Sequence, residues 1–243
     1  MSEVIIFKSD AWAEGVAVKI VAALRVALAT RQRATILLSG GSTPIPVHQA
    51  LVQAEGIDWE LVHFFWGDER YVPPHDAASN FRMARESLLD ELGIAPDAPN
   101  VHRCPTERTP NEDAAHYEAE IMAFFGLADG QFPQFDVILL GMGGDGHTAS
   151  LFPDTEALSE TSHIVVANPV PAQNTIRLTL TYPALTHGRH IFVLLKGAGK
   201  AARLAEVLHG EPNQYPIQGI QPIAGELLWL TDEAAAEQLE IRD

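Results

Sequence analysis

Basic residues and cysteine are both scarce in this chain of 243 residues. Lys and Arg together number 16 against 32 Asp and Glu, which gives a formal net charge of −16 at pH 7. Because nucleic acid binds to basic surfaces, this balance argues against a nucleic-acid partner. Cys104 is the single cysteine, so an internal disulfide is impossible. A reducing, cytoplasmic location is therefore expected.

Long apolar stretches and a basic leader are also missing. No apolar run approaches the roughly 18 residues of a membrane-spanning helix, and Met1-Ser2-Glu3 lacks the basic stretch that begins a secretory signal. We therefore expect no membrane partner. The length suits one large α/β domain or two small ones. No repeat, low-complexity tract or linker divides the chain, so a single domain over residues 1–243 is predicted.

The chain is organised around residues 135–153, FDVILLGMGGDGHTASLFP. Residues 137–140 form a short apolar run bounded by glycines, which is typical of a strand buried on both faces of a parallel sheet. The glycines that follow allow a tight turn and close approach to a ligand. This turn carries Asp145 and His147 at the carboxyl end of the strand, where ligands bind in open α/β sheets. We interpret it as a catalytic turn.

The same glycines also match a dinucleotide fingerprint, Gly141-x-Gly143-x-x-Gly146. That fingerprint needs a long helix opening at its last glycine. Pro153 follows too soon for such a helix, so a substrate turn is favoured over a nicotinamide or flavin site. His147 also lacks a His or Cys partner at zinc-site spacing. We predict neither a cofactor nor a metal.

Strand-like and helix-like patterns alternate along the rest of the chain. This alternation predicts one doubly wound, mainly parallel, Rossmann-like α/β sheet flanked by helices. The predicted strands are 4–7, 34–38, 61–66, 101–103, 137–140, 164–167, 176–180, 191–195 and 227–230. The predicted helices are 10–29 with Asp10 as N-cap, 44–54, 80–92, 111–125, about 200–208 and 232–241.

The loop at 39–44, SGGSTP, joins a predicted strand to a predicted helix. Ser42 or Thr43 can cap the helix, and Pro44 suits its first position. Free N–H groups and the positive helix end would make a phosphate site. A plain strand-to-helix turn explains the pattern about equally well.

Charged side chains follow other predicted strands. Asp68 and Arg70 come directly after strand 61–66, where they are costly near a core unless they are paired or used; a surface turn with an ion pair is the alternative. Arg177 lies in an apolar context and is either an edge residue in solvent or an anion ligand. Lys200 falls in the first turn of a helix, where a cation opposes the helix dipole unless an anion lies between them.

Three loops read together carry a resemblance to a known family: SGGSTP at 39–44, GDERYVP at 67–73 and GMGGDGHTASLFP at 141–153. The set resembles the family of 6-phosphogluconolactonases and glucosamine-6-phosphate deaminases, and the likeness covers nearly the whole chain. The run after His147 has the lactonase form. The resemblance implies hydrolysis of 6-phospho-D-glucono-1,5-lactone to 6-phosphogluconate in the oxidative pentose phosphate route. The expected partner is that small sugar phosphate lactone, bound by a monomer or weak homodimer.

Roles for the site residues follow from that chemistry. We expect neutral His147 to act as general base, since imidazole titrates near working pH. Asp68 or Asp145 would orient it or bind a sugar hydroxyl. Glycine N–H groups would hold the oxyanion. The substrate- and phosphate-binding candidates are Gly40, Gly41, Ser42, Thr43, Arg70, Asn80, Arg82, Gly143, Gly144, Arg177 and Lys200; Lys196 either assists or lies in solvent.

Three alternatives stay open at this point. A nucleophilic-serine hydrolase is disfavoured because the chain has no G-x-S-x-G elbow. A deaminase would release ammonia from glucosamine 6-phosphate. A non-catalytic sugar-phosphate sensor would usually be fused to a DNA-binding region, and no basic helix-turn-helix segment fits in these residues.

Overall fold

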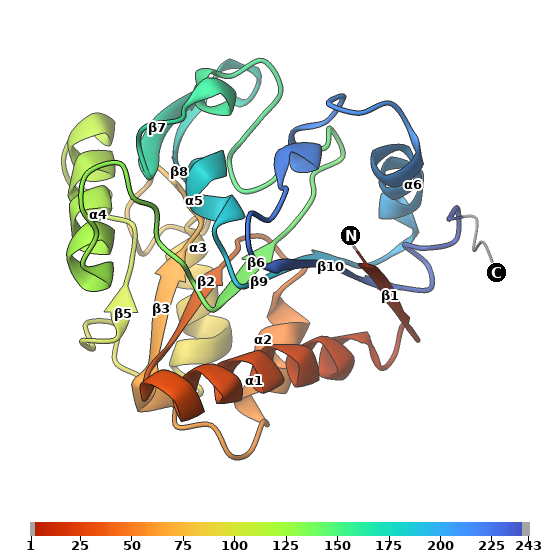
Figure 1. Cartoon of the computed structure of the whole chain (residues 1–243), viewed down its shortest axis with the longest axis horizontal. Coiled ribbons are helices and arrows are strands. Elements are labelled where there is room, and N and C mark those ends of the chain that lie inside the picture. Colours follow the sequence, from red (N-terminus) through yellow and green to blue (C-terminus); the bar gives the residue numbers. More distant parts are fainter. Residues whose placement is uncertain (1–2, 240–243) are drawn as a thin grey trace.

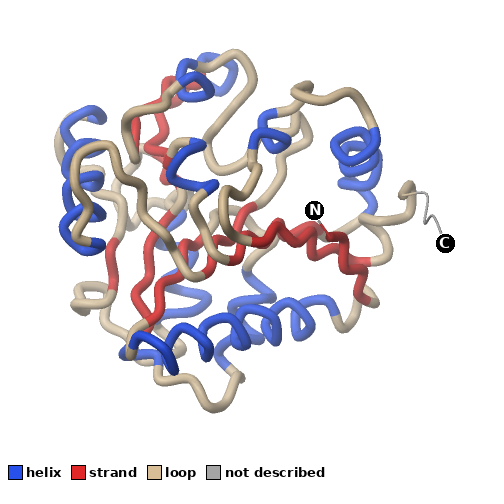
Figure 2. Tube along the Cα trace, viewed as in Figure 1, coloured by secondary structure: helices blue, strands red, loops and turns tan. Residues whose placement is uncertain are grey.

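The structure, a computed structural model, describes residues 3–239 (Figures 1 and 2). Its centre is a parallel seven-stranded sheet in the order β1-β10-β9-β6-β2-β3-β5. The strands are β1 (Glu3–Phe7), β2 (Ala34–Leu38), β3 (Val62–Trp66), β5 (Val101–His102), β6 (Val137–Leu140), β9 (His190–Leu195) and β10 (Glu226–Asp232). The predicted α/β fold with a mainly parallel sheet is confirmed.

The strand order reverses between β2 and β6. From β2 the chain continues outward to β3 and β5, whereas from β6 it continues to β9 and β10 on the other side. The loops that leave β2 and β6 therefore diverge and open a crevice at the carboxyl ends of these two strands. Such a switch point is where open α/β sheets bind their ligands.

Helices lie on both sides of this sheet. Figure 1 shows α1 and α2 on one side, with α5 and α6 on the other. Their bounds are α1 (Trp12–Arg31), α2 (Ile45–Val52), α3 (Asn80–Ala84), α4 (Pro110–Phe125), α5 (Tyr182–Thr186) and α6 (Ala201–His209). The predicted helix 80–92 divides into α3 and a π-helical turn over Arg85–Leu89.

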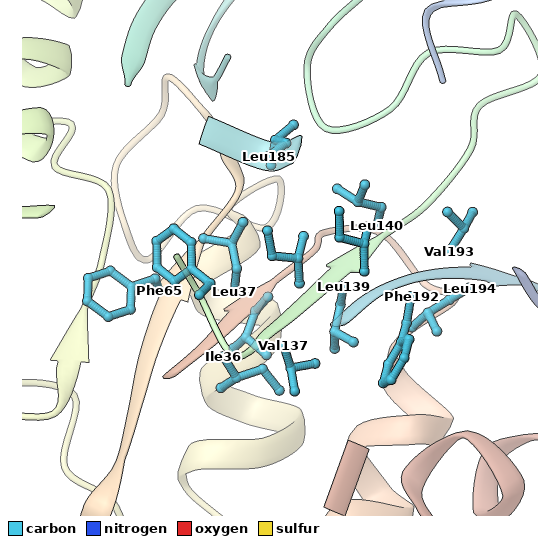
Figure 3. Close-up of a cluster of buried hydrophobic side chains, with 14 of the residues drawn as sticks. Ile36, Leu37, Phe65, Val137, Leu139, Leu140, Leu185, Phe192, Val193 and Leu194 are labelled. Atoms are coloured by element: carbon cyan, nitrogen blue, oxygen red, sulfur yellow. The ribbon is translucent and has the colours of Figure 1, made fainter. Parts of the chain in front are cut away.

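The core forms where the apolar strand runs meet these helices. All residues of β2 and β6 are buried, which confirms the expectation of a central strand covered on both faces. Figure 3 shows Val137 and Leu139 of β6 among side chains of the neighbouring strands, including Ile36 and Phe192. This burial anchors the start of each loop that enters the crevice.

A second, antiparallel sheet was not predicted and corrects the single-sheet expectation. It consists of β4 (Asp68–Arg70), β8 (Thr175–Leu180) and β7 (Val165–Val170), in that order. After Gly67 the chain leaves the parallel sheet, and the amide of Leu180 donates to the carbonyl of Gly67. The predicted strands 164–167 and 176–180 therefore pair as a hairpin. They do not extend the parallel sheet.

Several predicted helix ends are wrong in detail. The N-cap of α1 is Ala11 rather than Asp10, and it makes no side-chain cap hydrogen bond. Pro44 takes the cap position of α2 with a helical backbone, so neither Ser42 nor Thr43 caps this helix. Strand 227–230 is the last predicted strand of the chain and would close the sheet, but it is not the edge strand, because β1 lies beyond β10.

The predicted C-terminal helix 232–241 is also wrong within the described residues. Asp232 ends β10, and its carboxylate accepts hydrogen bonds from the amides of Gly197 and Ala235. Residues 233–238 are turns. The side chain of Asp232 thus terminates the strand, and residues 240–241 lie outside the described part of the chain.

The buried histidine of α2 predicts a loss of stability in acid. His48 is fully buried, and burial lowers its pKa from 6.5 to about 4. Between pH 6.5 and about 4, His48 binds a proton in the unfolded chain but not in the native state. The free energy of unfolding therefore falls as the pH falls. Its contribution is at most about 1.4 kcal/mol per pH unit. Urea unfolding of the wild type at several pH values from 7 to 4.5 measures this slope.

The matched variants are His48→Leu and, as control, His75→Gln at an exposed position. We expect His48→Leu to show a shallower dependence of unfolding free energy on pH over this window. His75→Gln should keep the wild-type slope. An unchanged slope in His48→Leu would contradict the assignment.

Candidate active site

A cavity of about 320 Å³ lies at the switch point between β2 and β6. It brings together the loop after β2, the glycine turn after β6, the β4–β8 pair and the start of α6. Its lining residues are Ser39, Gly40, Gly41, Ser42, Thr43, Pro44, Asp68, Arg70, Asn80, Gly141, Met142, Gly143, His147, Ala149, Phe152, Gln173, Arg177, Leu194 and Lys200. Loops far apart in the sequence therefore converge as predicted.

His147 and Asp145 form a hydrogen-bonded pair in the glycine turn. The Nδ1 atom of His147 lies 2.5 Å from Oδ1 of Asp145, and the backbone amide of His147 donates to the same oxygen. Partial burial alone would raise the pKa of Asp145, but the hydrogen bonds and charge of His147 lower it overall. With Nδ1–H directed at the carboxylate, Nε2 is the nitrogen that can accept a proton.

Packing against Phe152 fixes the plane of the imidazole. The two rings are stacked with centroids 4.0 Å apart. The phenyl group lies seven residues from Asp145 on the same loop, so one segment supplies the acid, the base and the surface on which the base rests. Asp145, rather than Asp68, is the carboxylate that contacts this histidine.

The amide of Gly143 has a structural role that the sequence did not reveal. It donates to the carbonyl of His147 at 2.9 Å and so closes the turn. To serve as the predicted oxyanion donor, the amide of Gly143 would have to give up or share this hydrogen bond. Gly144 does not line the cavity.

Asp68 belongs to a buried polar network at the other wall. Its carboxylate accepts a hydrogen bond from Oγ of Ser150 at 2.7 Å, and Nδ2 of Asn80 donates to its carbonyl at 2.9 Å. Asn80 in turn lies against Gly40 of the loop after β2. Asp68 is 6% exposed. These contacts tie three separate loops together.

The neighbouring Glu69 explains why a second acid is tolerated here. Its carboxylate accepts amide hydrogen bonds from Asn80 and Phe81 and one from Oγ of Ser79. Burial raises the pKa of the Glu69 carboxyl, and the backbone donors offset part of that shift. The acidic loop is therefore used to hold the start of α3, and the surface-turn alternative is excluded.

Two arginines face each other across the small sheet. Arg70 and Arg177 are directly paired in the β4–β8 register, an arrangement in which like charges repel. Both line the cavity, and the Nε atom of each is buried without a partner in the described part of the chain. Burial, followed by the charge of Arg70, lowers the pKa of Arg177. Such a pair is suited to an anion.

Lys200 approaches the same cavity from the N-terminal end of α6. Its Nζ atom donates to the carbonyl of Met142 at 2.7 Å, which brings it to the glycine turn. Together with Arg70 and Arg177, it gives the cavity three cationic side chains in a protein of net charge −16. The expected local concentration of basic residues is thus present.

Other predicted residues lie elsewhere. Arg82 is not among the lining residues, because its guanidinium pairs with Glu86 and with the carbonyl of His75. Lys196 lies over the ring of Trp12, in a groove between α1 and α2. These contacts take both side chains away from the cavity.

Sequence reasoning missed three residues that shape the site: Phe152, Gln173 and Ser150. Gln173, in the turn between β7 and β8, accepts a hydrogen bond from Arg177 at 2.7 Å. Ser150 holds Asp68. No local pattern marks Gln173, because its role depends on the hairpin. Ser150 lies within the glycine-turn motif, and its hydroxyl was the one available signal.

Neither a metal cluster nor a membrane-spanning helix is present among residues 3–239. Within residues 3–239, no group of three or more His, Cys, Asp or Glu side chains is arranged to hold a metal ion. Among the helices of the same range, none has both the length and the apolar character needed to cross a bilayer.

The fold and the cavity define the class of protein: an α/β enzyme that works at the switch point of a parallel sheet. The family model described as "Glucosamine-6-phosphate isomerases/6-phosphogluconolactonase" matches residues 8–229. The chain belongs to this family.

Relatives and solved structures agree with this assignment. The chain is 46% identical to a 6-phosphogluconolactonase of Synechocystis over 88% of both chains. It is 38% identical to one of Mycobacterium tuberculosis over 91% of both. The crystal structure of 6-phosphogluconolactonase from Thermotoga maritima is similar, with a TM-score of 0.83, 30% identity, and coverage of 96% of this chain and 100% of that one.

Proposed function

We propose that this protein hydrolyses 6-phospho-D-glucono-1,5-lactone to 6-phospho-D-gluconate, a step of the oxidative pentose phosphate pathway. The observation that carries the proposal is the presence, in one cavity, of a carboxylate-oriented imidazole and three cationic side chains. The similarity to proteins named 6-phosphogluconolactonase supports the same substrate.

The chemistry is acyl transfer from a ring ester to water. Nε2 of His147 accepts a proton from water while the water oxygen attacks the lactone carbonyl carbon. The tetrahedral intermediate then collapses and breaks the bond to the ring oxygen. The imidazolium returns its proton to this leaving oxygen, and the new carboxylic acid ionises. Asp145 holds Nδ1–H throughout and stabilises the positive charge on the ring.

The cationic side chains would hold the phosphate. Arg70 and Arg177 have buried, unpartnered Nε atoms in the described part of the chain, and Lys200 lines the same cavity as the loop 39–44. Binding of a non-reacting phosphate fixes the lactone relative to His147 and supplies binding energy remote from the carbonyl. Asn80 and Asp68 also line the cavity and are suited to sugar hydroxyls.

Acid release from freshly prepared lactone, corrected for spontaneous hydrolysis, tests the activity. We expect rapid hydrolysis of the phosphorylated lactone and much slower hydrolysis of glucono-1,5-lactone, which lacks the phosphate. Ammonia release from glucosamine 6-phosphate tests the deaminase alternative and is expected to be absent. Binding of 6-phosphogluconate without any hydrolysis would indicate a sensor.

Arg177→Met tests the phosphate contact. We expect kcat/KM for the phosphorylated lactone to fall about thirtyfold, the value of a lost charged hydrogen bond. The slow reaction of glucono-1,5-lactone should change little. Arg103→Met is the control, because Arg103 pairs with Glu107 at the surface and does not line the cavity. Equal losses on both lactones would mean that Arg177 does not bind the phosphate.

A further inference from the structure

Three backbone carbonyls of the glycine turn accept hydrogen bonds from α6 and from the segments before and after it. Lys200 donates to the carbonyl of Met142 and Arg203 donates to that of Gly144, in both cases at 2.7 Å. The amide of Ile217 donates to the carbonyl of Gly146 at 3.0 Å. Lys200 lies in the 3-10 turn just before α6, Arg203 in α6, and Ile217 in the segment that follows it. Hydrogen bonds thus hold the turn at every second residue, at Met142, Gly144 and Gly146.

Arg203, unlike Lys200, does not line the cavity. Nε donates to Gly144, while Nη1 pairs with Glu206 one turn further along α6. Its guanidinium lies 4.1 Å from the ring centroid of Tyr215, and the hydroxyl of Tyr215 donates to Glu206. The guanidinium is therefore held in one orientation by three neighbours.

The turn needs such support because of its composition. Glycines lose more conformational freedom on ordering than other residues, and Gly143, Gly144 and Gly146 all lie beside the catalytic pair. Gly146 has a φ of 78°, and its Cα lies against Tyr215, where an added Cβ would approach to 2.7 Å. Contacts from α6 and Tyr215 therefore select one conformation of the turn.

We propose that Arg203 is a positioning residue for the reaction: it holds the Gly144 carbonyl, and with it the turn that directs Asp145 and His147 toward the cavity. This inference rests on the proposed lactonase function. α6 then joins two tasks, because Lys200 at its start lines the substrate cavity while Arg203 fixes the turn that carries the base.

The test is steady-state kinetics of Arg203→Met on the phosphorylated lactone. We expect kcat to fall about tenfold, because a small displacement of the base is costly for catalysis, with KM within twofold of wild type. Arg203→Lys should recover part of kcat, since an ammonium can still donate to Gly144. Arg103→Met is the control for loss of an arginine–glutamate ion pair at the surface, and it should keep the wild-type kcat.

Glu206→Gln provides an independent variant, because it removes the charge that orients the guanidinium while leaving Arg203 in place. We expect a loss of about threefold in kcat and no change in KM. Wild-type kcat in both Arg203→Met and Glu206→Gln would overturn the proposal, as would a rise in KM alone, which would mean substrate contact. If the wild type itself has no lactonase activity, the proposed function fails instead.

Discussion

His147→Asn is expected to lower kcat for the phosphorylated lactone by about a thousandfold, within the range that general acid–base catalysis contributes. Asparagine can occupy the place of the imidazole and keep a hydrogen bond to Asp145, but it cannot take a proton from water at neutral pH. The expected defect is therefore confined to the chemical step. Acid release over long incubation, with the spontaneous rate subtracted, measures it.

Binding should survive this substitution. The cationic side chains belong to other elements, so the dissociation constant of 6-phosphogluconate, measured by calorimetry, is expected to stay within about threefold of wild type. A variant that retains more than a tenth of wild-type kcat would rule out His147 as the general base. A variant that loses both hydrolysis and product binding would instead make this histidine a ligand.

Gly143→Ala is the second large effect we expect, with kcat reduced at least about a hundredfold. A Cβ at this position would lie 2.1 Å from Nδ1 of His147 and 2.7 Å from Oδ1 of Asp145. Moving either side chain away would break the hydrogen bond between them. The backbone is held as well, because the amide of Gly143 closes the turn. The methyl group must therefore displace the catalytic pair.

Gly144→Ala is the matched comparison. A Cβ there meets nothing within 4 Å, so the variant adds the same methyl group to the same loop without the collision. We expect a much smaller loss of kcat, with thermal unfolding of both variants measured alongside. Similar losses in the two variants would show that general stiffening of the loop, rather than contact with His147, is responsible.

The parallel sheet could be predicted because most of its strands are short apolar runs followed by glycine or polar residues. Strand 34–38 was placed without error and 137–140 likewise. The small antiparallel sheet could not be predicted, because β4 has only three residues, Asp68–Arg70, and none of them is apolar. Its pairing with β8 depends on where the chain turns after Gly67, and no local pattern encodes that direction.

The residues of the site could be predicted better than the contacts between them. Glycine and charge at strand ends identified the loops, because these residue types are rarely placed there without use. Which acid would orient His147 was left open, and the structure gives Asp145. Arg82 could have been excluded, because Glu86 lies four residues further along a helix and is a ready ion-pair partner. The hydrogen bond from the amide of Gly143 to the carbonyl of His147 could not be predicted from the sequence, because it depends on the conformation of the turn.

The distribution of charge bears on how the catalytic cycle ends. Hydrolysis turns an uncharged ester into a carboxylate, so the molecule that leaves carries one more negative charge than the one that enters. Inside the cavity Arg70, Arg177 and Lys200 attract both. Over the whole chain, 32 acidic side chains outnumber 16 basic ones, and at about 0.1 M salt their field reaches roughly 10 Å. The same excess that slows encounter with the substrate favours product release.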